Sequence, residues 1–364
     1  MRIVIDLTSI SYHLSGIERY AMCITDKLID IDKKNTYFLI FRNEIPSTFV
    51  DRIDGNRINA KVLTGNNKLI FLQFTLRKAL QQIKADKYLF FAFRSPVFFK
   101  RKGIINTIHD MGAWDSSQEM KFLSKWYFRL SYRRAAAISE KIITVSNFSK
   151  DRIVSILNVP YEKVVVISSA VNETLNSDSI VSFSKVKKQY NIPEKYIMTL
   201  STLEPRKNIK LLLEVFDRLA DKVDYDLVLV GRKGWKIDNI LQEYHSKNRI
   251  HITGFIEDDY LSSVYKNAMC FVFPSLYEGF GLPPIEALSL GTPVLSSDAA
   301  SLPEVLMDRA IYFKSNDSKS LEAILISLDN KLENMPKCLN DYQIENFSFD
   351  TSARKVFEQI INCN

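Results

Sequence analysis

Residues 271–291 read FVFPSLYEGFGLPPIEALSLG. The apolar run at the start is typical of a buried strand. The run IEALSLG predicts a helix that ends at Gly291, because glycine is the usual residue just past a helix C-terminus. Pro283 and Pro284 fall where this helix begins, and proline is tolerated in a first helical turn but not in a helix interior. The stretch therefore predicts a strand, a glycine-containing loop and a helix, which is the repeating unit of an α/β fold.

The same alternation of strands and helices runs through the whole chain. Several of the strand-like runs are apolar on both faces, as parallel strands covered by helices are. In the first half, helices are expected near 16–31, 121–138 and 148–157, and strands at 2–7, 36–41, 57–63, 87–91, 104–108, 141–145 and 163–167. In the second half, strands are expected at 196–201, 225–231, 249–254, 269–275, 292–297 and 310–313.

These patterns predict two doubly wound α/β domains in tandem, which suits a chain of 364 residues because single cores of that size are unusual. We expect a first domain over 1–175, a polar linker over 176–195 and a second domain over 196–345. The closing segment 346–364 carries apolar residues at helical spacing and predicts a final helix.

The composition is that of a soluble globular protein, with 46% hydrophobic and 25% charged residues. No run of about 18 apolar residues predicts a membrane-spanning helix, and the first residues lack the pattern of an export signal. Four cysteines and four histidines are scattered without metal-ligand spacing. We therefore expect a protein of the reducing cytoplasm that holds no metal ion and no other cofactor.

Charge is distributed unevenly. Residues 1–175 contain 27 Lys and Arg against 16 Asp and Glu, and the remainder contains 22 against 26. Lys121, Lys125, Arg129 and Arg133 recur at a spacing of four and predict a basic stripe on one helix, interleaved with Phe122, Trp126, Tyr127, Phe128 and Tyr132. The pattern has two interpretations: a peripheral contact with the anionic inner face of the cytoplasmic membrane, or aromatic residues in the core beside solvated cations.

The loop in 278–286 has the chemistry of an anion site. Gly279 and Gly281 can bring bare backbone close to a ligand and adopt a positive φ, and a helix N-terminus follows, so the loop suits a diphosphate. Glu278 and Glu286 flank it, and carboxylates there would accept hydrogen bonds from hydroxyls. A nucleotide sugar has hydroxyls on both sides of its diphosphate. The alternative is an exposed Glu278 with Glu286 complementing the helix dipole.

Three other junctions between a strand and a helix carry candidate residues. Arg206 and Lys207, in EPRKN, suit phosphate oxygens and could neutralise charge on a leaving nucleoside diphosphate. His109, in IHDMG, lies at the end of the strand GIINT (103–107), and the neighbouring Asp110 is expected to orient that loop. Gly16 opens a helix whose amides could approach a diphosphate; its surroundings do not match the GxGxxG pattern of dinucleotide sites.

The spacing of Glu278 and Glu286, together with the residues around them, resembles the signature of the retaining glycosyltransferase family 4. This family is also called glycosyl transferases group 1. The resemblance extends over nearly the whole chain, through the segments IHDMG (108–112), ITVSNFSKDRI (143–153), STLEPRKNIKLLLEVF (201–216), LVLVGRKGW (227–235), HITGFIEDDYLSSVYKNA (251–268) and SLPEV (301–305). It implies the GT-B fold: two facing Rossmann-like domains with a cleft between them and a C-terminal helix crossing back to the first. The first domain would bind the acceptor and the second the nucleotide sugar.

Site roles follow from the same resemblance. Glu278 would bond the transferred sugar and Glu286 the ribose, while His109 would contact the donor sugar and Gly16 the diphosphate. Arg206 and Lys207 would stabilise the leaving phosphate, and the backbone of Gly279, Phe280, Gly281 and Leu282 would bind the sugar and distal phosphate. Family members often carry a second glycine where this chain has Glu18, which receives no role.

The implied reaction is transfer of a hexose or deoxyhexose with retention, in which attack and departure share one face and the leaving phosphate takes the acceptor's proton. The motifs favour a GDP-mannose-like donor, with UDP- and dTDP-sugars left open, and a lipid-linked oligosaccharide of a bacterial O-antigen, capsule or other surface polysaccharide as acceptor. A sugar-nucleotide epimerase of similar fold is the alternative. A nucleic-acid binder is not expected, because no RNP, KH or helix-turn-helix pattern occurs.

Overall fold

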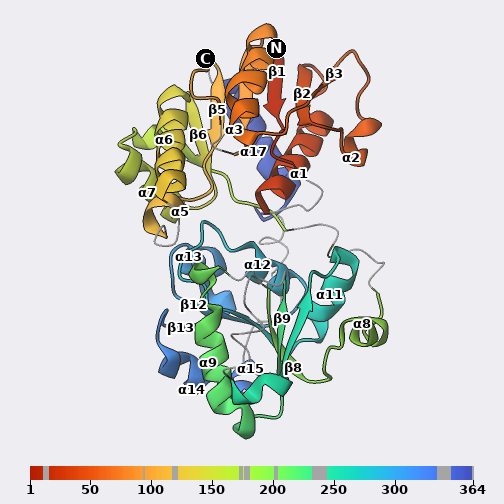
Figure 1. Ribbon diagram of the computed structural model, residues 1–364, viewed down its shortest axis with the longest axis vertical. Helices are drawn as coiled ribbons and strands as arrows, with labels where there is room; N and C mark the ends of the chain where they lie inside the picture. Colours follow the sequence, from red (N-terminus) through yellow and green to blue (C-terminus); the bar gives the residue numbers. More distant parts are fainter. Residues whose placement is uncertain are drawn as a thin grey trace. The chain divides into compact units, whose positions relative to one another are not determined.

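A computed structural model of the chain describes residues 1–10, 16–92, 95–116, 122–171, 175, 181–200, 204–231, 244–333 and 346–362. The chain divides into two compact units. The first combines Met1–Ala170 with Asn346–Asn364, and the second comprises Val171–Glu345. Each unit is an α/β structure, with helices packed around a central sheet (Figure 1).

The described residues of the first unit form a seven-stranded sheet in the order β3-β2-β1-β4-β5-β6-β7. Every neighbouring pair of strands is parallel. The bounds are β1 Arg2–Asp6, β2 Thr36–Arg42, β3 Ile58–Leu63, β4 Lys87–Phe90, β5 Ile104–Thr107, β6 Lys141–Thr144 and β7 Val164–Val166. All seven strands expected in this half are confirmed. The order reverses between β1 and β4, and parallel sheets commonly bind ligands at such a switch point.

The helices expected in this half are also confirmed. They are α1 Gly16–Ile31, α6 Phe122–Ile138 and α7 Asn147–Leu157. Shorter turns connect the strands: α2 Ser47–Val50, α3 Lys68–Ile70, the π-helix η1 Phe71–Leu76, α4 Arg77–Gln82, α5 Gly112–Asp115 and η2 Tyr161–Lys163. Within the described ranges, no helix has the length and apolar character needed to cross a membrane.

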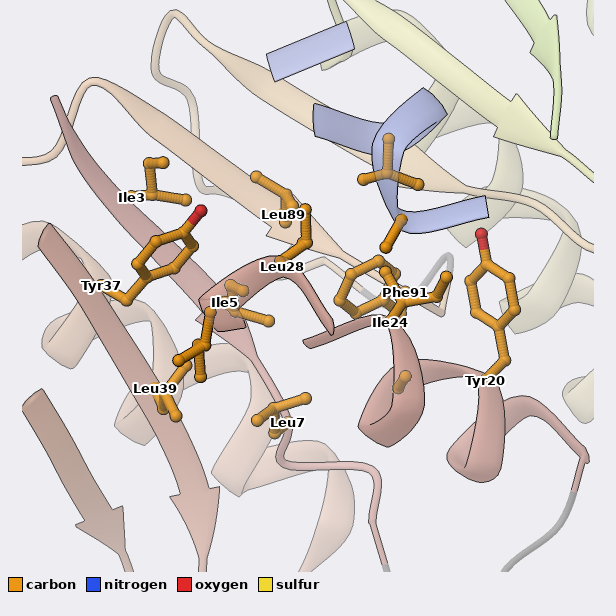
Figure 2. Close-up of a cluster of buried hydrophobic side chains, with 14 of the residues drawn as sticks. Ile3, Ile5, Leu7, Tyr20, Ile24, Leu28, Tyr37, Leu39, Leu89 and Phe91 are labelled. Atoms are coloured by element: carbon orange, nitrogen blue, oxygen red, sulfur yellow. The ribbon is translucent and has the colours of Figure 1, made fainter. Parts of the chain in front are cut away.

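The last helix, α17 (Phe349–Asn362), belongs to the first unit and packs against α1. Its buried face, which includes Ala353, Val356 and Ile360, lies in the same core cluster as Tyr20 and Ile24 of α1. Figure 2 shows side chains of α1 pointing toward those of the strands, with the ribbon of α17 alongside. Ser352 Oγ donates a hydrogen bond to the carbonyl of Ser168 at 2.8 Å. The two ends of the chain therefore complete one core.

The described residues of the second unit form a six-stranded sheet in the order β10-β9-β8-β11-β12-β13, again parallel throughout. All six strands expected here are confirmed, and the order reverses between β8 and β11. The strands are β8 Tyr196–Leu200, β9 Asp226–Val230, β10 Ile250–Gly254, β11 Cys270–Phe273, β12 Val294–Ser297 and β13 Ala310–Phe313. The helices are α8 Phe183–Tyr190, η4 Pro205–Lys207, α9 Ile209–Leu219, η5 Ala220–Lys222, η6 His245–Arg249, α11 Asp258–Asn267, α12 Leu282–Ser289, α13 Leu302–Leu306, η7 Met307–Arg309, α14 Ser318–Ile326 and α15 Leu328–Leu332.

The segment treated above as a linker, 176–195, falls inside the second unit, which begins at Val171. Helix α8 packs against α11 there. The ring of Tyr190 meets that of Tyr260 edge-on at 5.8 Å, and the Lys185 ammonium lies 5.8 Å from the same Tyr260 ring. The described part of this segment is thus a helical layer of the second unit, which its polar composition does not reveal.

We expect Ile360→Ala to lower the free energy of unfolding of the first unit by about 2–5 kcal/mol, because the side chain is fully buried and its removal leaves a cavity. The neighbouring Ile361 is 45% exposed, so Ile361→Ala should change it by less than about 0.5 kcal/mol. Urea unfolding followed by far-UV circular dichroism measures both. Equal losses from the two variants would contradict the packing of α17 on α1.

Candidate functional site

The switch point of the second sheet brings two loops together. Strands β8 and β11 are neighbours, and the chain after β8 turns through η4 into α9, whereas the chain after β11 leads to α12. The backbone N–H of Leu276 donates to the carbonyl of Arg206 at 2.7 Å, so the two loops are joined directly. Arg206 and Lys207 therefore meet the loop that begins at Glu278.

A buried ion cluster lies at this junction. Lys207 Nζ is 2.6 Å from Glu278 Oε1, and Arg206 Nη1 is 3.5 Å from Glu278 Oε2. The side chains of Lys207 and Glu278 are only 11% and 10% exposed, and the Lys207 ammonium lies 5.1 Å from the Phe273 ring. The pair of Lys207 and Glu278 thus lies where water is largely excluded, which strengthens its attraction. Arg206 is 31% exposed and also pairs with Glu204 Oε2 at 2.8 Å. The alternative in which Glu278 is an exposed surface group is wrong.

Hydrogen bonds from side chains to backbone carbonyls fix the loop that carries Glu278. Ser301 Oγ donates to the carbonyl of Glu278 at 3.0 Å, and Arg206 Nη1 donates to the carbonyl of Tyr277 at 3.4 Å. The sequence analysis gave Ser301 no chemical role, although SLPEV, which begins with this serine, is among the segments that carry the resemblance. Its hydroxyl is a supporting group that a motif alone does not distinguish from an ordinary loop serine.

The glycine loop ends in a left-handed residue. Gly281 has φ +96° and is the N-cap of α12, and a Cβ added there would lie 2.7 Å from Leu302 Cδ2. Only glycine fits without displacement of a neighbour. Gly291, with φ +81°, follows the C-cap of α12, and Pro283 lies in the first turn, as the sequence predicts. Gly279 is buried but is absent from the residues with positive φ, so that part of the expectation is wrong.

The N-terminus of α12 adjoins the ion cluster through this loop. Helix N-termini present unsatisfied N–H groups and the positive end of the helix dipole, which attract anions. Phe280 is 6% exposed, and Leu282, the first residue of α12, is half-buried. Glu286 lies further along the same helix, also half-buried. The arrangement can hold a diphosphate between the backbone of this loop and two cations, with a carboxylate on either side of the loop.

The first unit holds the other two candidate residues, His109 and Gly16. His109 Nε2 is 2.9 Å from the carbonyl of Phe91 and therefore carries the proton, because a carbonyl oxygen only accepts. Burial lowers the pKa of His109, so the ring is neutral near pH 7 and Nδ1 is an acceptor. Asp110 Oδ1 accepts from the N–H of Gly112 at 2.8 Å and orients the loop. Gly16 is exposed at the first position of α1.

Within the part of the chain that the structure describes, no three His, Cys, Asp or Glu side chains gather in a way that could hold a metal ion. The positive charges at the ion cluster are those of Arg206 and Lys207.

Two family models match the two halves of the chain. The model described as Glycosyltransferase Family 4 matches residues 14–175, and the model described as Glycosyl transferases group 1 matches residues 182–342. The second match contains Arg206, Lys207, Glu278 and Glu286, and the first contains His109 and Gly16. The alternative of a sugar-nucleotide epimerase gains no support from either model.

Relatives and solved structures agree with these matches. O-antigen chain mannosyltransferase B of Escherichia coli is 29% identical over 351 residues, with 91% of each chain covered. O-antigen chain mannosyltransferase RfbU of Salmonella typhimurium is 28% identical, over 69% of this chain and 67% of the relative. The structure of sucrose-phosphate synthase from Thermosynechococcus elongatus superimposes with a TM-score of 0.76 at 16% identity, covering 100% of both chains. The chain belongs to the family 4 (group 1) glycosyltransferases and is an enzyme with the GT-B fold.

Proposed function

We propose that the chain transfers mannose from GDP-mannose to a lipid-linked saccharide during assembly of a bacterial O-antigen. The names of the two mannosyltransferase relatives support the sugar and the process. The observation that carries the proposed donor site is the buried contact of Lys207 with Glu278, which Arg206 also contacts, beside the N-terminus of α12. The first unit supplies acceptor binding in this proposal, and the second binds the donor.

The diphosphate would lie against the amides of the loop 279–282 and take up the cations. Lys207 has three N–H donors and Arg206 five, so both can bind phosphate oxygens while still contacting Glu278. The Glu278 carboxylate would accept hydrogen bonds from hydroxyls of the transferred sugar, and Glu286 from those of the ribose. His109 and Gly16 keep the donor contacts that the family resemblance implies.

In the proposed step, the bond between the sugar C1 and the distal phosphate oxygen breaks as the acceptor hydroxyl forms a bond to C1 on the same face. The hydroxyl proton passes to a phosphate oxygen, so the products are the lengthened saccharide and a nucleoside diphosphate. Negative charge grows on the leaving phosphate, and the preplaced Arg206 and Lys207 stabilise it without reorganising.

Variants of the ion cluster test the donor site. We expect Lys207→Ala to lower kcat for mannose transfer by roughly 10²–10³-fold, the range for removal of one preorganised charge-stabilising donor. Glu278→Gln keeps the side-chain shape and should abolish transfer while retaining binding of GDP. Lys210→Ala is the matched control, because Lys210 lies one turn onward and is 78% exposed. The assay is transfer of radiolabelled mannose from GDP-mannose.

Thermal-shift measurements with GDP-, UDP-, dTDP- and ADP-sugars identify the donor. GDP-mannose at 100 times its dissociation constant should stabilise the fold by about 2.7 kcal/mol. Stabilisation by a UDP-sugar alone would refute the choice of nucleotide. Unchanged turnover of every sugar donor in both Lys207→Ala and Glu278→Gln would refute the site.

The glycine loop gives a second test. Gly281→Ala forces a side chain into a positive φ and against Leu302, and should reduce both stability and binding of GDP-mannose. Gly254→Ala is the matched control, because Gly254 has φ +75° and open space around it. Both variants carry a backbone cost of about 1–2 kcal/mol, so only Gly281→Ala should lose donor binding beyond it. Equal GDP-mannose affinities in isothermal titration would count against the loop as the diphosphate site.

The proposed membrane contact rests on helix α6. Its outward face is apolar rather than basic: Phe122 is 72% exposed, Leu123 81%, Trp126 61% and Leu130 54%. Of the aromatic residues that sequence interleaves with the cations, Tyr132 is in the core at 5%. Apolar residues that insert between lipid headgroups, with cations beside them, are typical of interfacial helices.

The exposure and contacts of the cations in the basic stripe differ from the expectation of one solvent-facing row. Lys125 and Arg129 are half-buried, and Arg129 Nε donates to the carbonyl of Ala113 at 3.1 Å while its guanidinium lies 5.3 Å from the Trp114 ring. Arg133 is exposed, 6.0 Å from the same ring. Lys121 lies outside the described residues. Arg129 thus has a structural task, and the contact with anionic lipid falls to the apolar residues with Lys125 and Arg133.

Cosedimentation with phosphatidylglycerol vesicles tests this contact. We expect the double variant Leu123→Glu and Trp126→Glu to weaken binding by at least about tenfold, since full burial of one large apolar side chain contributes about 1.5–3 kcal/mol. Ile326→Glu, in the second unit, changes a side chain of similar exposure, 54%, and should have no effect. Charge reversal of Lys125 and Arg133 should weaken binding chiefly to anionic vesicles. Unchanged cosedimentation of both variants would exclude α6 as the contact.

A further inference from the structure

A cavity of about 210 Å³ lies within the first unit, at the switch point of its sheet. Strands β1, β2 and β4 bring their carboxyl ends there, and η1 and α6 supply the opposite wall. The lining combines polar groups from the strand ends with an apolar wall, chiefly Asp6, Thr8, Arg42, Phe71, Tyr127 and Phe128. The position corresponds to that of the ion cluster in the second sheet, but here a wall with three aromatic rings lies opposite the polar groups.

Asp6 is the polar group that needs explanation. It ends β1, and its Oδ1 accepts from the N–H of Thr8 at 3.0 Å. Burial raises the pKa of Asp6 to about 6, so the ionised form that prevails above that pH is disfavoured in the folded protein. An asparagine would fill the same space without this cost. A carboxylate kept at a strand end facing a cavity is typical of a ligand-binding group.

The aromatic wall is held in place by Arg42, the last residue of β2. Its Nη2 donates to the carbonyl of Gly65 at 2.7 Å and to that of Asn66 at 3.2 Å, and its guanidinium lies 4.8 Å from the Phe71 ring. Arg42 therefore positions Phe71. Tyr127 and Phe128 are half-buried on α6, with ring centroids 5.8 Å apart. The cavity offers a preformed aromatic surface opposite a hydrogen-bonding edge.

Such a cavity suits a sugar ring, which has an apolar face of C–H groups and a rim of hydroxyls. Ligand pockets for larger molecules usually measure about 300–1,000 Å³, so this one suits a single ring. Resting on the proposed function, we propose that this cavity binds one sugar ring of the acceptor saccharide, with Asp6 accepting hydrogen bonds from its hydroxyls and Tyr127 stacking on its apolar face. The site would select the acceptor and play no part in donor binding.

The surroundings of the cavity support this choice of ligand. Beside this wall, α3 and η1 expose Ile70 and Phe74 at 58% and 67%, and α6 exposes Leu123 and Trp126. Leu69, which lines the cavity, is itself 53% exposed. Hydrogen bonds through residues 97–99 join α6 to η1. Arg134 of α6 donates to the carbonyls of Val97 and Phe99, and the N–H of Val97 donates to Gln73 of η1. The sugar of a lipid-linked acceptor would thus bind beside the surface proposed to meet the lipid. A lipid chain in the cavity itself would leave the Asp6 carboxylate against hydrocarbon, which is costly.

Saturation-transfer difference NMR with methyl glycosides of mannose, galactose, glucose, rhamnose and N-acetylglucosamine tests the proposal on the full chain. At least one glycoside should contact the wild-type protein and bind at least tenfold more weakly to Asp6→Asn and to Tyr127→Leu. Asp51→Asn and Tyr161→Leu are matched controls at exposed positions of the same unit, and Glu278→Gln controls for binding at the donor site. All three should bind as the wild type does.

Folding and donor binding are measured on the same samples. Asp6→Asn should be at least as heat-stable as the wild type at pH 8, because it removes a carboxylate that is disfavoured above pH 6. The rise in melting temperature with GDP-mannose should persist in both cavity variants; its absence from the wild type would refute the proposed donor but not the cavity. Three results would overturn the cavity proposal: no glycoside contacts the wild type, binding survives in both variants, or decyl phosphate displaces the glycoside.

Discussion

The contact of Glu278 with Lys207 and Arg206 is the interaction on which the proposed donor site depends. Removing one partner of a buried ion pair typically costs about 3–5 kcal/mol, because the other charge stays buried without compensation. Here the Glu278 carboxylate contacts both Lys207 and Arg206, and Arg206 also pairs with Glu204. In the proposed complex, the sugar hydroxyls and the phosphate would share this set of charges. A site organised in this way needs little rearrangement when negative charge develops on the leaving group.

Both units use the same architectural device. Each sheet is parallel, and each reverses its strand order once, between β1 and β4 in the first unit and between β8 and β11 in the second. The loops that leave adjacent strands there turn to opposite faces and leave room at the sheet edge. The edge in the second unit carries the pair of Lys207 and Glu278 with Arg206 beside it, and the edge in the first unit carries Asp6, Arg42 and aromatic rings. Similar scaffolds can thus offer complementary sites for an anionic donor and a neutral saccharide.

The sequence predicts the strands well because parallel strands buried on both faces leave continuous apolar runs. It predicts the glycine loop because Gly281 and the prolines after it have strict backbone requirements. It does not predict that Lys207 binds Glu278, 71 positions away, since that depends on which strands are neighbours. The cavity beside Asp6 is hidden for the same reason. In α6, the spacing of the cations is visible, but which face packs against the fold is not, so the apolar outer face emerges only in three dimensions.

The return of α17 to the first unit affects how the protein is made. The second unit is continuous in sequence, so it can acquire its full set of contacts once residue 345 has left the ribosome. The first unit cannot, because Val356 and Ile360 complete a core begun by Ile3 and Ile5. During synthesis, the earlier half therefore waits for the later one, with apolar surface of α1 uncovered in the meantime. Domains usually mature from the N-terminus onward; here the core of the first unit also needs the last helix of the chain.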